Sequence, residues 1–131
     1  NLNPVTTCYR VFILFDFLEN RGKMLIMNEK HSKMYILVKK SLPSHKAVAI
    51  AHGVLMCYLK YQDRPEVQEW LKNSFRKVIC EVTDKEFEAV KCESDYVIVT
   101  ESAFDNMECA LAFKPRIDWP EEFKYYSLMK I

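Results

Sequence analysis

Basic side chains gather around one short stretch of the chain, between an apolar run and a long stretch of small residues. They lie on both sides of Pro43 and within eight residues of one another. Cations of this kind bind phosphate or carboxylate groups, and a helix beginning here would add free backbone N–H donors. The alternative is a set of solvated lysines at a strand end. We predict an anion-binding site formed by Lys39, Lys40, Ser44, His45 and Lys46.

Carboxylates that could act with these cations lie later in the chain. Glu101 and Asp105 bracket a predicted turn, and they would face the basic segment if the strand ends coincide. A carboxylate beside Lys46 would form a pair suited to general acid–base catalysis. Asp95 and Glu108 are further acidic candidates. We take Lys46, Glu101 and Asp105 as the candidate catalytic residues, although acidic residues in turns are more commonly just solvated.

A histidine within the small-residue stretch is a weaker candidate for chemistry. His52 lies in the apolar segment AIAHGVL, residues 49–55. A lone histidine in such a segment is more commonly a packed core residue than a catalyst, so we expect His52 to be buried. Gly53 lowers helix propensity and is expected to serve close packing.

Other chemistries have less support in the sequence. A nucleophilic serine would need a GxSxG elbow, which is absent. The three histidines lack ligand spacing, so neither a metal nor a cofactor is predicted. The five cysteines form no CxxC pair and are odd in number, which favours reduced core cysteines in a cytoplasmic protein.

Two segments would position the basic site. The continuous apolar run Met34–Val38 is typical of a strand that is covered on both faces. The stretch 45–61 is predicted to be a helix with Ser44 as its N-cap. Because apolar residues surround most of its circumference, we expect this helix to be central and well buried.

The rest of the chain alternates strands and helices. This order predicts an α/β fold: a mixed four-stranded sheet with helices on both faces, in the order β-α-α-β-α-β-β-α, plus an N-terminal extension. The further elements are a helix over 64–75, a strand at Lys77–Val82, a helix from the Thr83/Glu86 capping box to about Cys92, an antiparallel hairpin of Tyr96–Thr100 and Met107–Phe113 with one face of its second strand inward, and a last helix capped by Asp118.

The segment 33–61, followed by this element order, resembles the type II peptidyl-tRNA hydrolase family over about residues 33–131. That family has a strand, a lysine-bearing loop and a helix of small residues ending in a His-Ala pair. The family lysine is offset by one position here, and a glutamine is expected where this chain has alanine. Residues 101–106 (ESAFDN) lack the glycines and threonines of the family's second motif. The matching stretch is Lys46, Ala47, Ala49, Ala51, His52 and Gly53.

The resemblance implies a hydrolase that cleaves the ester between a peptide, or an amino acid, and the end of a tRNA, with no required metal. It implies Lys46 as the residue that contacts a phosphate or an oxyanion, and Glu101 or Asp105 as the substituted acid. The departures from the family motifs leave an alternative open. This is a catalytically silent anion-binding or protein-interaction module on the same fold.

Composition sets the remaining expectations. At 131 residues with a net charge of +1, the chain should form one core and has no overall basic field for nucleic acid. A tRNA, or another phosphate-bearing ligand, would therefore be bound by a local patch. No run reaches the roughly 18 apolar residues of a membrane span, so no membrane partner is expected.

The first part of the chain is expected to stand apart from the domain. We predict an N-terminal extension or arm over residues 1–32 and a peptidyl-tRNA hydrolase II-like domain over residues 33–131. The apolar run Val11–Leu18 could form an extra edge strand, or an arm exchanged with a second subunit in a homodimer.

Overall fold

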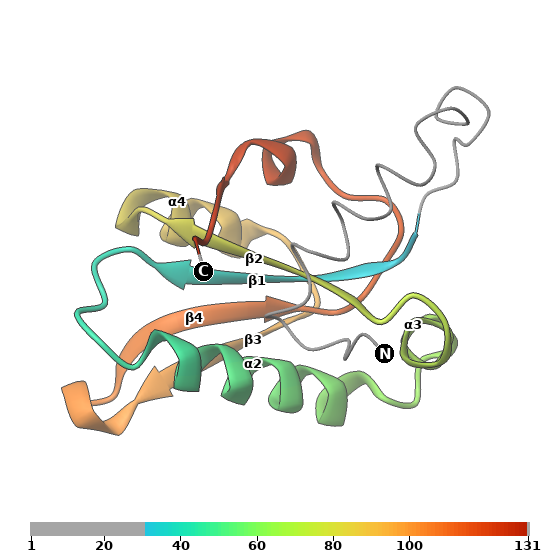
Figure 1. Cartoon of the computed structure of the whole chain (residues 1–131), viewed down its shortest axis with the longest axis horizontal. Helices are drawn as coiled ribbons and strands as arrows, with labels where there is room; N and C mark the ends of the chain where they lie inside the picture. The colour runs from blue at the N-terminus through green and yellow to red at the C-terminus, as the bar shows by residue number, and fades with distance from the viewer. Residues whose placement is uncertain (1–30, 131) are drawn as a thin grey trace.

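The computed structural model of the chain describes residues 31–130, in which five strands form one mixed sheet in the order β3-β4-β1-β2-β5 (Figure 1). The predicted α/β class with a mixed sheet is confirmed. Val11–Leu18 and the predicted arm exchange lie outside the described residues. The strands are β1 (Lys33–Lys39), β2 (Arg76–Val82), β3 (Tyr96–Glu101), β4 (Met107–Phe113) and β5 (Ser127–Leu128); the helices are α2 (Lys46–Tyr61), α3 (Pro65–Lys72) and α4 (Asp84–Ala89).

Two parts of the predicted order are wrong. The described sheet has five strands rather than four, because Ser127–Leu128 pairs antiparallel with the end of β2. The last helix is only a five-residue 3-10 helix, Glu121–Tyr125, and it follows Pro120 rather than an Asp118 cap. Aromatic packing holds this segment: the buried Phe123 ring lies 5.0 Å from the ring of Tyr35.

Strand pairing brings the chemically interesting ends to one edge of the sheet. β1 and β2 are parallel, so both end at the edge where α2 begins. β4 is antiparallel to both β1 and β3, so the β3–β4 turn lies at this edge as well (Figure 1). Met34 to Val38 of β1 are at most 5% exposed, which confirms a strand that is covered on both faces.

β4 is buried on both faces, whereas its alternating pattern predicted one inward face. The reason is its place beside β1 in the middle of the sheet. Leu111 packs on the side of α4, and Ala110 and Ala112 pack on the side of α2. The register of β3 and β4 shifts after Val99, which is a bulge close to the turn.

Gly53 lets α2 lie close to this part of the sheet, as predicted. A Cβ atom there would be 3.3 Å from Ala112 Cβ and 3.3 Å from Val99 Cγ2. The glycine and the alanine therefore remove side-chain bulk at the same contact. Residues with larger side chains on either element would push the helix away from the sheet.

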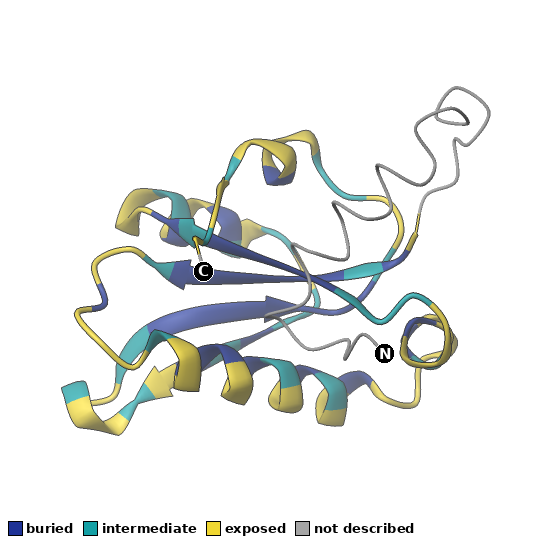
Figure 2. Cartoon of the chain, viewed as in Figure 1, coloured by how far each residue is buried: buried dark blue, intermediate teal, exposed yellow. Residues whose placement is uncertain are grey.

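The predicted burial of α2 on all sides is wrong. The sheet covers one side of the helix, and the outer side is exposed (Figure 2). His52 belongs to the exposed side, so the expectation of a packed core histidine is also wrong. The helix lies in an outer layer, so apolar residues around its whole circumference do not mean burial here. Its buried residues are Ala49, Ile50, Gly53, Cys57 and Tyr61.

Candidate anion-binding and catalytic site

The start of α2 is formed by His45 rather than by a serine cap. His45 is the N-cap residue in a left-handed conformation with φ 70°, and no side chain caps the helix there. Ser44 Oγ instead lies 2.7 Å from His45 Nδ1, in a hydrogen bond. Both residues are exposed. The backbone N–H groups of the first turn therefore face outward beside an imidazole.

Lys46, the first residue of α2, is held by a carboxylate of the sheet. Its Nζ lies 2.9 Å from Glu81 Oε2 on β2, and the two side chains are 26% and 24% exposed. The predicted acid/base pairing of Lys46 therefore has a carboxylate partner, but it is Glu81. The sequence reasoning missed Glu81. A charge inside the apolar run of β2 was the available signal.

The β3–β4 turn approaches the start of α2 through an aromatic contact. The rings of Phe104 and His45 meet edge to face, with their centroids 5.4 Å apart. Glu101 precedes this turn, and its Oε2 accepts a hydrogen bond from Ala103 N at 3.3 Å. Its Oε1 is buried and accepts no hydrogen bond from the described residues. This oxygen keeps its capacity to accept a proton or a hydrogen bond.

The other predicted site residues are divided between different surroundings. Lys39 extends toward α4, where its Nζ lies 4.7 Å from the centre of the Phe87 ring. Lys40 is exposed, and its backbone N–H donates to Val82 O at 2.8 Å. Asp105 is exposed in the turn with φ 54°, and no hydrogen bond or ion pair joins it to Lys46. The exposed cations at this edge are thus Lys40 and His45.

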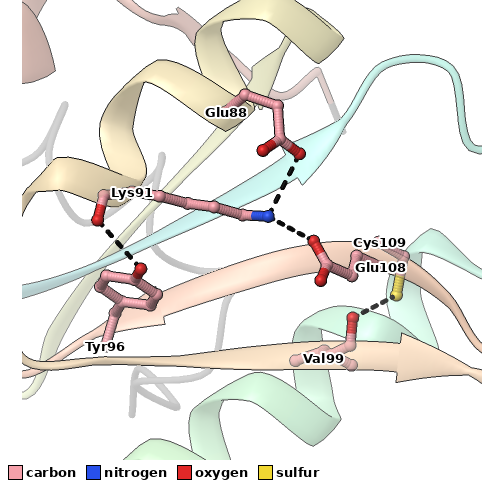
Figure 3. A network of polar contacts seen from close by, with 6 residues as sticks. All are labelled: Glu88, Lys91, Tyr96, Val99, Glu108 and Cys109. Carbon is pink, nitrogen blue, oxygen red and sulfur yellow. Dashed lines mark hydrogen bonds and ion pairs between the residues drawn. The ribbon is translucent and has the colours of Figure 1, made fainter.

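Glu108 is excluded from the basic edge by a different partner. Its Oε1 lies 2.5 Å from Lys91 Nζ, and this lysine also pairs with Glu88 at 3.1 Å (Figure 3). The hydrogen bond with Glu108 raises the pKa of Lys91. Tyr96 Oη donates to the backbone oxygen of the same lysine at 3.0 Å. This network joins the end of α4 to β3 and β4, which is a structural role.

The thiol next to the turn reports the local charges. Burial raises the pKa of Cys109, the negative charge of Glu101 raises it further, and Lys39 opposes both effects. Cys109 is fully buried and donates to Val99 O at 3.3 Å. A thiol in this environment stays protonated, so it does not serve as a nucleophile.

The site contains the parts of a polar hydrolytic or anion-binding centre. They are an uncapped helix start, a lysine fixed by a carboxylate, an exposed imidazole and a carboxylate with one unoccupied oxygen. Within residues 31–130, no three His, Cys, Asp or Glu side chains are grouped so that they could hold a metal ion. No helix in the same range is long and apolar enough to cross a membrane. A scan against protein-family models finds no match for the chain, and a search of the curated proteins finds none either.

Proposed function

We propose that the chain binds the phosphate-bearing end of a tRNA at this edge and hydrolyses a peptidyl- or aminoacyl-tRNA ester there. The observation that carries the proposal is the contact between Phe104 and His45, 5.4 Å between ring centres. It holds the turn that contains Glu101 against the start of α2. A free carboxylate oxygen and an anchored ammonium group then belong to the same edge of the sheet.

Each group has a role in the proposed reaction. Glu101 Oε1 accepts a proton from a water molecule, and the oxygen of that water attacks the ester carbonyl carbon. The ammonium of Lys46 stabilises the negative charge that develops on the carbonyl oxygen. The ribose oxygen leaves with the proton that Glu101 accepted, so the products are a carboxylic acid and a free tRNA end. Glu81 fixes the position of the lysine throughout.

The phosphates would be bound by the exposed cations. Lys40 and His45 lie at the surface, and the first turn of α2 offers free N–H groups. Phosphate binding at a helix start needs only these donors and a favourable dipole. Because the net charge of the chain is only +1, affinity for tRNA should depend on this patch and should fall steeply with salt.

One observation favours the second candidate function, a silent anion-binding module. Lys46 already has a carboxylate partner at 2.9 Å, which offsets the positive charge that an oxyanion would require. In that case the edge binds tRNA or another phosphate-bearing ligand without turnover.

The two functions are separated by measuring binding and turnover on the same samples. Full-length chain is mixed with a labelled peptidyl-tRNA, and bound tRNA and released peptide are both followed. Release above the no-protein rate, lost in Lys46→Ala, supports the hydrolase. Binding without release, weakened in a Lys40→Glu, His45→Ala double variant, supports the silent module. Neither binding nor release would contradict both.

A further inference from the structure

The outer side of α2 is an uncharged apolar surface that none of the described elements covers. The described chain has eight large apolar side chains that are exposed, and half of them lie on this helix. Their exposed fractions are 44% for Val48, 59% for Leu55, 40% for Met56 and 56% for Leu59. Exposed apolar patches of this concentration mark interaction sites in soluble proteins.

These residues form a straight seam along the helix. Val48, His52, Leu55 and Leu59 are spaced by four, three and four residues, which places them on one stripe. All four are exposed. The only charged side chain among the exposed residues of α2 is Lys60, whose Nζ lies 5.3 Å from the ring of the buried Tyr61. The seam itself therefore carries no carboxylate or ammonium group.

We propose that this face is the interface of a homodimer in which α2 packs antiparallel against α2 of a second copy. The seam reads alike in both directions around a point between Gly53 and Val54. Val48 then meets Leu59 of the other copy, and Leu55 meets His52. Beside the seam, the small Ala51 meets the large Met56, so bulk on one copy faces space on the other.

A second copy fits this face better than a charged surface would. In a two-fold interface each contact occurs twice, so every favourable pair on the seam is doubled. Homodimer interfaces are more apolar than other interfaces and are depleted in charge at their centre. Antiparallel packing also separates the two Lys46 residues by the length of the helix, about 24 Å for 16 residues. No like charges are then brought together on the seam.

The size of the face sets the expected strength. A single helix of this length covers less than the roughly 800 Å² per partner of a standard stable interface. The dimer should accordingly dissociate on dilution, with a dissociation constant on the order of 100 µM.

Sedimentation of the full-length chain over a range from about 1 to 500 µM tests the proposal. We expect a reversible monomer–dimer equilibrium that Leu55→Asp weakens at least about tenfold, because it buries a carboxylate opposite apolar groups. Ile117→Asp is the matched control, since Ile117 is 49% exposed in a different part of the chain, and it should not change the equilibrium. A chain that stays monomeric throughout, or a dimer unaffected by Leu55→Asp, would overturn the proposal.

Cross-linking tests the antiparallel register. Cys8 and the exposed Cys92 are first replaced by serine. Val48→Cys and Leu59→Cys are then prepared in separate chains and treated with a bifunctional maleimide of about the interaxial distance, roughly 8–10 Å. In the proposed dimer each variant alone places its two thiols about 16 Å apart along the helix axis. We expect cross-linked dimers only when the two variants are mixed, and efficient cross-linking of either variant alone would refute this register.

Discussion

Lys46 Nζ donates a hydrogen bond to Glu81 Oε2 over 2.9 Å, which ties the first residue of α2 to the parallel strand β2. The pair is about three-quarters buried on both sides. It fixes where α2 begins relative to the ends of β1 and β2. The same pair decides how much positive charge the start of the helix can offer to an anion.

Glu81→Gln should therefore change anion binding. The substitution removes the countercharge of Lys46, so affinity for inorganic phosphate and for tRNA should rise several-fold, while stability should fall by about 1 kcal/mol. Phosphate titration and chemical unfolding measure the two effects. Glu88→Gln is the control, because Glu88 pairs with Lys91 outside this edge. An unchanged phosphate affinity in Glu81→Gln would mean that Lys46 takes no part in anion binding.

Gly53→Ala should destabilise the chain even though alanine is the better helix former. The new Cβ would lie 3.3 Å from Ala112 Cβ, and both neighbouring strands are buried and fixed. We expect a loss of roughly 1 kcal/mol, since overpacking outweighs the propensity gain of up to about 1 kcal/mol. Adding Ala112→Gly should recover part of it. Gly53→Ala with unchanged or increased stability would show that α2 can move away from the sheet.

Lys77 should make stability rise with pH. It is 4% exposed, and burial lowers its pKa to about 8. An unfolded lysine has a pKa of about 10.4, so between pH 8 and 10 the unfolded state binds more protons and stability increases with pH. Below pH 8 this contribution is constant. Lys77→Met should remove the rise, seen as a difference between the two unfolding free-energy curves. Parallel curves would contradict a lowered pKa.

The cysteines should differ sharply in reactivity. Burial raises the pKa of Cys57 and of Cys80 to about 12, so neither forms a thiolate near pH 8. Cys92 is exposed. Maleimide labelling of the folded chain followed by mass spectrometry should find label on Cys92 and none on Cys57 or Cys80. Rapid labelling of either buried cysteine without denaturant would show that the core opens at that place.

Local patterns in the sequence were sufficient for most elements of the fold. The continuous apolar run of β1 gave a buried strand, and the capping box of Thr83 and Glu86 is present with both of its hydrogen bonds. Pro65 lies at the start of α3, as proline at a first helical turn should. Such features depend on neighbours within a few residues, so they can be deduced before any tertiary contact is known.

Features that depend on distant residues were mispredicted. The exposure of His52 follows from the absence of a described layer outside α2, which no local pattern records. The pairing of Lys46 with Glu81 spans 35 positions and depends on the register of two parallel strands. Predicting the strand β5 would have required knowing that the end of β2 was unpaired. In each case the deciding partner lies in another element.

The central claim is that Glu101 acts as the base in ester hydrolysis, and the rate of peptidyl-tRNA cleavage by Glu101→Gln tests it most directly. The substitution keeps the size of the side chain and its bond to Ala103 N, but it removes the proton acceptor. We predict that full-length wild type cleaves the ester and that Glu101→Gln is slower by about 10²-fold or more. Glu108→Gln, at a carboxylate already paired with Lys91, should stay within about twofold of wild type. Equal rates for Glu101→Gln and wild type, or wild-type cleavage no faster than the reaction without protein, would contradict the account.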